Sequence, residues 1–314
     1  MSESSEELIR LAKKGSSCSF KRRLGHRHEL RTLQDRHGNF LVHHAVNGGN
    51  TGVVEYLLES GVSATTPGEN GATPLHYAAA RGRADILRLL LAKQSAVMPV
   101  NQNAMTPLHV AAGEGHPDVV RLLIGRGAQL NATARLGRLA VHFATGTDQL
   151  EVVKFLVSLD PAQLLVPDDF GMQPLHWACY FGAFDTAQWL LSEGVPVNES
   201  DVYGRLPGTF ARNATCSRLK DAARGLPGWP LKLQYSAIHE VVLAGDQDQL
   251  QRVLGDTENT RQCDAFGRTP LHLAALTGNR GIFEALREWG LPTSQRDDYG
   301  WTPWKLLSFR RIGM

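Results

Sequence analysis

The stretch Thr73-Pro74-Leu75-His76-Tyr77-Ala78-Ala79-Ala80-Arg81-Gly82 decides how this chain folds. Its first four residues recur unchanged from Thr106 and from Thr269, and with one difference from Gln173. The histidine of this tetrapeptide, or of a looser copy, is found at His43, His76, His109, His142, His176, His239 and His272. Successive histidines are 33 or 34 residues apart, except for one interval of 63. A period this regular indicates a chain built from repeated structural units.

Each position of the repeat has a physical reason. Pro74 suits the first turn of a helix, because its fixed φ is already helical and its missing N–H would have no partner there. Thr73 can cap the same helix. Gly82 can end it in a left-handed conformation, so that a second, leucine-rich helix turns back. The small residues Ala78 and Ala79 let neighbouring helices approach closely, and stacking buries the apolar faces that one unit cannot bury alone.

This pattern resembles the ankyrin-repeat family, whose unit is 33 residues long with a T-P-L-H-x-A signature. The resemblance implies an all-α fold, a solenoid of helix-loop-helix units joined by β-hairpin-like loops. We predict an N-terminal capping repeat over 1–32, a first sub-array over 33–207, a degenerate joint over 208–232, and a second sub-array with a C-terminal cap over 233–314. In the joint, Gly208 and Thr209 replace the expected Leu and His, so we expect local stability to be lowest there.

The composition fits an intracellular globular protein, in the cytoplasm or the nucleus. Of its 314 residues, 42% are hydrophobic and 20% charged, and the formal net charge is +2, which does not indicate a nucleic-acid binder. The four cysteines lie far apart and give no zinc or disulfide pattern. Neither a signal peptide nor an apolar run long enough to span a membrane is expected.

The sequence predicts no enzyme, no cofactor and no metal site. Seven of its twelve histidines occupy the repeat position, where the ring is expected to bond the backbone of the adjacent loop. The G-x-S-x-G, P-loop, G-x-G-x-x-G and H-E-x-x-H motifs are absent. Two alternatives stay open. One is an enzyme or enzyme subunit built on this scaffold. The other is a regulatory substrate, because Asn131 and Asn198 occupy positions that resemble targets of asparaginyl hydroxylation, although Gln129 and Pro196 replace the usual acidic residue.

The resemblance implies a scaffold or adaptor that binds another protein through its concave face, rather than a small molecule. In this family, partners usually contact the hairpin tips and the exposed pair just before the helix-closing glycine. Tyr180-Phe181 is the one aromatic pair in that position. Aromatic residues, Met and Arg are also enriched at interface hot spots. We therefore predict a protein-binding patch made of Arg138, Phe170, Met172, Tyr180, Phe181, Tyr203 and Arg205. The alternative is that Phe170 and Tyr203 pack between hairpins as structure.

A basic segment in the N-terminal cap includes Lys13, Lys14 and Lys21. Nuclear import, nucleic acid or an anionic membrane surface would each use such a patch. We favour the simpler interpretation, a solvated outer face, because a terminal repeat must be polar to keep the array soluble.

Overall fold

A computed structural model describes residues 3–23, 32–93, 98–210, 237–254, 262–264 and 267–309. These residues form helices, with one isolated β-bridge between Gln34 and Phe40 and no strand. The predicted all-α class is therefore confirmed. The chain divides into two compact units, Met1–Pro207 and Gly208–Met314, which are described separately. Most of the predicted joint over 208–232 lies outside the described residues, so the sub-array boundaries stay a prediction.

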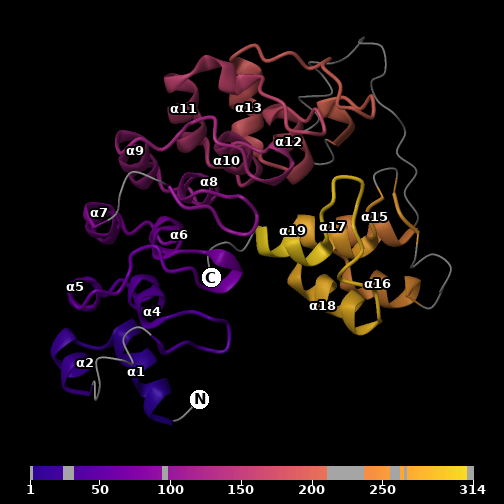
Figure 1. The fold of residues 1–314 in the computed structure, drawn as a ribbon. Helices are drawn as coiled ribbons and strands as arrows, with labels where there is room; N and C mark the ends of the chain where they lie inside the picture. The colour runs from indigo at the N-terminus through magenta and orange to yellow at the C-terminus, as the bar shows by residue number, and fades with distance from the viewer. Residues whose placement is uncertain are drawn as a thin grey trace. The chain divides into compact units, whose positions relative to one another are not determined.

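Unit 1 consists of two parallel rows of helices (Figure 1). The first row, called the inner helices below, comprises α1 (Glu3–Lys14), α4 (Leu41–Gly48), α6 (Pro74–Ala80), α8 (Pro107–Gly113), α10 (Ala140–Gly146) and α12 (Pro174–Phe181). The outer helices are α2 (Ser17–Arg23), α5 (Thr51–Glu59), α7 (Ala84–Ala92), α9 (Pro117–Gly125), α11 (Leu150–Leu159) and α13 (Phe184–Ser192). Short 3-10 turns lie at η1 (Glu69–Gly71), η2 (Arg135–Gly137) and η3 (Pro161–Leu164), and η4 (Pro207–Phe210) begins at the last residue of unit 1. Each inner helix packs against the next inner helix, and each outer helix against the next outer helix, as a stack requires.

The turn between the two helices of a repeat needs a left-handed residue. Gly82 supplies it with φ of 64°. One repeat has Asp148 in this position, with φ of 61°. Its carboxylate accepts the backbone N–H groups of Asp185 (3.3 Å) and Thr186 (2.9 Å), at the start of the next outer helix. The helix-capping bonds thus stabilise a conformation that asparagine and aspartate tolerate better than most side chains.

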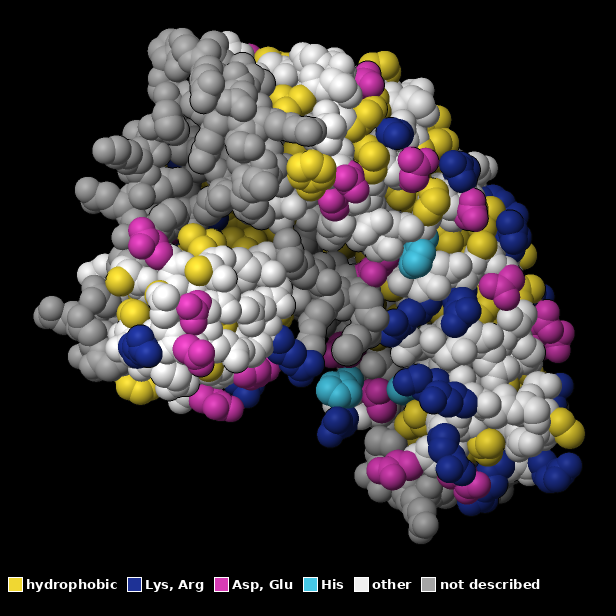
Figure 2. All heavy atoms as spheres, turned by 180° about the vertical axis from the view of Figure 1, so that it is seen from behind, with side chains coloured by type: hydrophobic (Ala, Val, Ile, Leu, Met, Phe, Trp, Pro, Cys, Tyr) yellow, Lys and Arg dark blue, Asp and Glu magenta, His cyan; other side chains and the backbone are white. Residues whose placement is uncertain are grey.

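The core of unit 1 lies between the two rows of helices. Leucine, valine and alanine side chains from both rows are fully buried there, Leu75 and Leu90 among them. At the N-terminal end α1 and α2 complete the stack with the buried Leu8, Ala12 and Phe20. Lys and Arg side chains gather over this cap (Figure 2), and Lys13, Lys14 and Lys21 are exposed. The cap is therefore apolar toward the stack and basic toward solvent.

Unit 2 repeats the same architecture. Its helices are α15 (Ala237–Ala244), α16 (Gln247–Val253), α17 (Pro270–Thr277), α18 (Arg280–Glu288) and α19 (Pro303–Phe309). Helices α15, α17 and α19 pack in one row, and α16 packs on α18.

Candidate functional site

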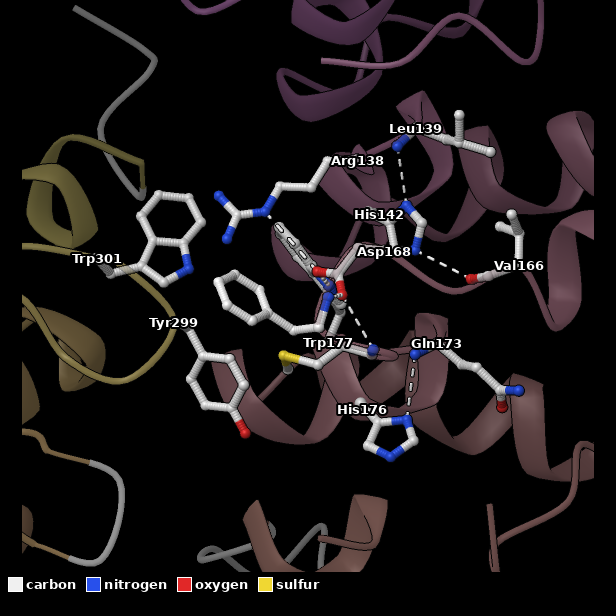
Figure 3. A network of polar contacts seen from close by, with 12 residues as sticks. Arg138, Leu139, His142, Val166, Asp168, Gln173, His176, Trp177, Tyr299 and Trp301 are labelled. Atoms are coloured by element: carbon white, nitrogen blue, oxygen red, sulfur yellow. Dashed lines mark hydrogen bonds and ion pairs between the residues drawn. The ribbon is translucent and has the colours of Figure 1, made fainter. Parts of the chain in front are cut away.

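The repeat histidines form a ladder of buried rings along the inner helices. In His142, Nδ1 accepts the backbone N–H of Leu139 at 3.0 Å, and Nε2 lies 3.1 Å from the carbonyl oxygen of Val166 (Figure 3). His109 makes the equivalent contacts to Thr106 N–H (3.1 Å) and to the Arg138 carbonyl (3.2 Å). Because a backbone N–H can only donate, Nδ1 must be unprotonated and Nε2 must carry the hydrogen. The predicted bonding of these rings to the backbone of the adjacent loop is confirmed.

Burial keeps the ladder neutral. It lowers the pKa of His142 to about 3, and that of His109 and His176 to about 4. A protonated ring would lose its acceptor at Nδ1 as well as its solvation. These histidines therefore join one repeat to the next, and they are not available as bases or metal ligands.

The hairpins between repeats share one hydrogen-bonded framework. At 168–172, the Asp168 carboxylate accepts the N–H groups of Phe170 and Met172, each at 3.0 Å. At 201–205, Asp201 accepts those of Tyr203 and Arg205, each at 2.9 Å. Asn101 makes the same two bonds in its hairpin, whereas Gly68 and Ala134 hold this position in the other two and have no such side chain.

Backbone hydrogen bonds also join neighbouring hairpins in unit 1. Their donor N–H and acceptor oxygen pairs are Gln102 to Asn70 (2.9 Å), Arg135 to Asn103 (3.0 Å), Asp169 to Leu136 (3.1 Å) and Val202 to Phe170 (2.9 Å). The third residue of each hairpin therefore falls into one row, which we call the tip row: Asn70, Asn103, Leu136, Phe170 and Tyr203. The row is polar in its first two hairpins and apolar or aromatic in its last three.

Below the apolar part of the tip row, Trp177 organises a buried network (Figure 3). Its indole Nε1 donates to Asp168 at 3.1 Å, and the Arg138 guanidinium lies over its ring, 5.1 Å from the centroid. Arg138 and Asp168 also form an ion pair, at 3.8 Å between Nε and Oδ2. Burial raises the pKa of the Asp168 carboxyl, and the charge of Arg138 opposes this shift. The network thus links helix α12 to two consecutive hairpins.

The structure separates the seven predicted binding residues into two groups. Tyr203 is 53% exposed, and Phe170 is half-buried. The other five are buried: Arg138, Met172, Tyr180, Phe181 and Arg205. The expectation that Phe170, Met172, Tyr180, Phe181 and Tyr203 form one exposed apolar patch, flanked by the two arginines, is therefore wrong, because three of the five are buried. Their role in binding a partner is a separate question and stays a prediction.

The buried residues have identifiable contacts within unit 1. Phe181 lies 5.3 Å from Trp177 and 4.9 Å from Tyr180, measured between ring centroids, so the aromatic pair extends the Trp177 cluster. Arg205 pairs with Asp201 at 3.1 Å and lies over the ring of Tyr203, 4.3 Å from its centroid. Arg205 thus pairs with the aspartate of its own hairpin, whereas Arg138 pairs with Asp168 of the next hairpin.

Sequence reasoning missed two exposed apolar residues, Leu136 in the tip row and Val202 beside it. Leu136 is 38% exposed and Val202 is 63% exposed. Leu136 also has φ of 65°, a left-handed conformation that is unfavourable for leucine. Trp177 was missed as well, although it follows a repeat histidine in the position held by Tyr77 and Phe143. An aromatic ring at this position in three repeats was the signal that could have identified Trp177.

Comparison with known sequences agrees with this geometry. The sequence model described as ankyrin repeats in three copies matches residues 8–99, 42–134, 91–164 and 108–201, and the single ankyrin repeat matches residues 266–297. This chain belongs to the ankyrin-repeat family. Among curated ankyrin-repeat relatives, the probable 26S proteasome regulatory subunit p28 of Saccharomyces cerevisiae is 30% identical over 158 residues, which is 47% of this chain and 69% of that protein.

Two further relatives match shorter parts of their own length. Ankyrin repeat domain-containing protein 13C-B of Xenopus laevis is 35% identical over 146 residues, 46% of this chain and 28% of that protein. The mouse 26S proteasome non-ATPase regulatory subunit 10 is 36% identical over 67 residues, 21% of this chain and 29% of that protein. The family and these relatives support an ankyrin-repeat scaffold for protein interaction.

The described residues contain no group of three or more His, Cys, Asp or Glu side chains placed to hold a metal ion. Among the same residues, none of the helices has the length and apolar character needed to cross a membrane. Asn131 and Asn198 are both exposed, and Asn131 accepts a hydrogen bond from Gln163 at 2.8 Å.

Proposed function

We propose that this protein is a non-catalytic scaffold that binds a partner protein through the tip row and inner helices of unit 1. The proposal rests on the change along the tip row from polar side chains to apolar or aromatic ones. Leu136, Phe170 and Tyr203 follow Asn70 and Asn103 on the same backbone framework, and Val202 lies beside them. Large apolar side chains exposed together usually mark an interaction site.

The conformation of Leu136 adds a second argument. Asparagine adopts left-handed backbone conformations more readily than leucine, and Asn70 has φ of 53° in the equivalent position. Leucine there is unfavourable for the backbone and exposes apolar surface. Neither property helps the fold, so a role in binding accounts for the residue better than stability does.

In this proposal the buried members of the predicted patch support the contact surface. Arg205 positions the ring of Tyr203, and Asp168 fixes the backbone of Phe170. Tyr180 and Phe181 pack on Trp177, which holds Asp168. Rigid support of this kind lowers the entropy lost on binding.

The names of the relatives fit such a role. Two of the three are named as regulatory subunits of the 26S proteasome, a multi-subunit assembly. We infer that this chain likewise functions by association with other proteins and not by its own chemistry. The predicted location inside the cell remains a prediction.

Affinity capture with a tip variant tests the proposal. The variant combines Leu136→Asn, Val202→Ser and Tyr203→Ser. Its matched control is Leu159→Ser with Leu165→Ser, because these leucines of unit 1 are 45% and 44% exposed and lie outside the tip row. We expect partners recovered with the wild-type chain to be lost by the tip variant and kept by the control. Equal recovery by both variants would refute the tip row as the binding site.

A further inference from the structure

The basic segment of the N-terminal cap lies partly on the inner row of helices. Lys13 and Lys14 end helix α1 just before Gly15, and α1 packs against the inner helix α4. Both lysine side chains are exposed, and Figure 2 shows basic side chains at the surface of this cap. The sequence favoured a solvated outer face for the whole segment, whereas these two lysines continue the row of inner helices.

The main chain at the end of α1 is held firmly against α4. The side-chain amide of Asn50 donates to the carbonyl oxygens of Ala12 at 3.2 Å and of Gly15 at 2.6 Å. A β-carbon added at Gly48 would overlap the carbonyl oxygen of Lys13, so glycine lets the two helices pack directly on each other there. These contacts fix the backbone of Lys13 and leave its charged side chain unused.

Three cations of α1 share one side of the helix. Lys13 and Lys14 follow Arg10 by three and four residues, and the buried Leu8 and Ala12 face the stack instead. Like charges at this spacing weaken a helix. With the residues that the structure describes, none of the three cations forms an ion pair. Their positive charge is therefore presented to solvent without compensation by contact.

The acidic residues of α1 leave its basic end uncompensated. Glu7 pairs with Arg23 of α2 at 2.8 Å. Glu6 lies one turn before Arg10 and can offset part of its charge. The same glutamate precedes Lys13 by seven residues, which is about 10 Å along a helix and exceeds the screening length of about 8 Å at physiological salt.

The charge of Lys13 also reaches the next inner helix. His44 of α4 is half-buried, and its Nε2 lies 3.1 Å from the carboxylate of Asp35. Burial lowers the pKa of His44, Asp35 opposes this shift, and the charge of Lys13 adds to it. The Asp35 carboxylate accepts the backbone N–H of Asn39 at 2.9 Å as well, so this acid is engaged within its own hairpin.

We propose that Arg10, Lys13 and Lys14, called the basic end below, bind an acidic segment of the partner protein. The inference rests on the proposed function, because it extends the partner-binding face along the same inner helices to α1. Charge complementarity selects this occupant. Aspartate and glutamate side chains of a partner supply the compensating charge that the described residues do not, and they form charge-assisted hydrogen bonds with ammonium and guanidinium groups.

Two other anionic partners fit the described cap less well. Single-stranded nucleic acid is usually bound with bases stacked on exposed aromatic rings, and the ring of Phe20 is fully buried. Peripheral membrane binding usually adds buried apolar area to electrostatic attraction. The exposed residues between 13 and 23 are lysines, arginines, serines and one cysteine, which provide little such area.

Selection from a library of random dodecapeptides displayed on phage tests the proposal, with the full chain as bait. The clones are then measured on a basic-end variant that combines Arg10→Gln, Lys13→Gln and Lys14→Gln. A matched control removes the same charge from exposed positions of the outer row: Arg88→Gln, Lys93→Gln and Arg126→Gln. We expect enrichment of Asp or Glu and at least about tenfold weaker binding to the basic-end variant, with the control unchanged.

The other outcomes overturn the proposal in distinguishable ways. Clones without acidic enrichment, or clones that bind the basic-end variant as tightly as wild type, refute the role of α1. Equal weakening by the outer-row control means a response to net charge and refutes a defined site. Failure to select any clone on wild type also counts against the proposal. Vesicles containing phosphatidylserine and a short single-stranded RNA are measured in parallel. If either probe needs the basic end while acidic clones are absent, the surface belongs to that ligand instead.

The tip variant separates this inference from the proposed function. Acidic clones that it still binds support the basic end, while affinity capture decides the tip row independently. Thermal melting checks the fold of the basic-end variant, which should match wild type because the three side chains form no ion pair in the described structure. Lys13→Gln alone should weaken the acidic clones by a smaller factor, and it replaces the triple variant if that variant melts early.

Discussion

The first two and the last three hairpins of the tip row are joined by the same kind of backbone hydrogen bond and carry different side chains. Asn70 and Asn103 belong to hairpins joined by the same kind of backbone bond as those of Leu136, Phe170 and Tyr203. Below the polar tips, Tyr77 is half-buried and donates its hydroxyl to Asn39 at 2.7 Å. Below the apolar tips, Trp177 is 1% exposed and bonded to Asp168. The framework therefore sets where side chains lie, and the proposed binding surface differs between the two regions through its tip residues.

The largest expected effect concerns the histidine ladder, which both regions share. Below pH 6.5 the unfolded chain takes up protons that the folded chain excludes, because burial lowers the pKa of His109 to about 4 and that of His142 to about 3. The contribution of each neutral ring to the free energy of unfolding is thus complete above pH 6.5. It is lost as the pH falls toward 4, by about 1.4 kcal/mol per pH unit for each histidine. Urea unfolding at pH 7 and pH 5.5 measures this slope.

Single substitutions test whether the histidine ladder contributes to the pH dependence of stability both below the polar tips and below the apolar tips. His76→Gln and His142→Gln should each reduce the pH dependence, since burial lowers the pKa of both rings. A pH-independent stability between 7 and 5.5 would contradict the neutral ladder.

The next largest effect is a difference in stability between the region below the apolar tips and the region below the polar tips. Trp177→Ala should lower the free energy of unfolding by about 3–5 kcal/mol, because it removes a buried aromatic ring and one donor to Asp168. The matched change Tyr77→Ala removes a half-buried ring and should cost clearly less. Denaturant titration of both variants gives the comparison. Equal losses would mean that the two regions are equally well packed.

A smaller effect, opposite in sign, is expected in the tip row. Leu136→Asn should raise the free energy of unfolding by roughly 0.5–1 kcal/mol, because asparagine tolerates the left-handed conformation better. Asn70→Leu should lower it by a similar amount, which provides the reverse control. If Leu136→Asn instead destabilises the protein, the leucine packs as part of the fold and its exposure has been misinterpreted.

The smallest effect concerns Tyr203. Its ring is 53% exposed, so Tyr203→Ser should change stability by less than about 0.5 kcal/mol while still reducing partner capture. Differential scanning calorimetry beside the affinity capture tests both statements. A large drop in melting temperature would favour the alternative that Tyr203 packs between hairpins as structure.

The repeat and its histidine contacts could be predicted because they depend on the backbone. A Thr-Pro start, a closing glycine and a buried histidine recur wherever the same turn recurs. His76 and His109 each bond the carbonyl oxygen 29 residues ahead, of Met105 and Arg138, as the period of the sequence implies. The fold therefore follows from positions shared by many repeats.

The candidate site could be predicted only in part, because exposure depends on neighbours outside the repeat. Tyr180 and Phe181 occupy a position that is small or polar in most repeats, which favoured an exposed pair. The rings pack instead on each other and on Trp177.

The bonds that join the hairpins have a consequence for how such a protein changes over evolutionary time. They link main-chain atoms alone, as between Val202 N–H and the Phe170 carbonyl. A mutation in the tip row therefore leaves them unbroken. Duplication or loss of one complete unit would likewise re-form the same bonds between new neighbours. The tip row can thus gain or lose whole units, or change one residue at a time. A different set of positions maintains the fold.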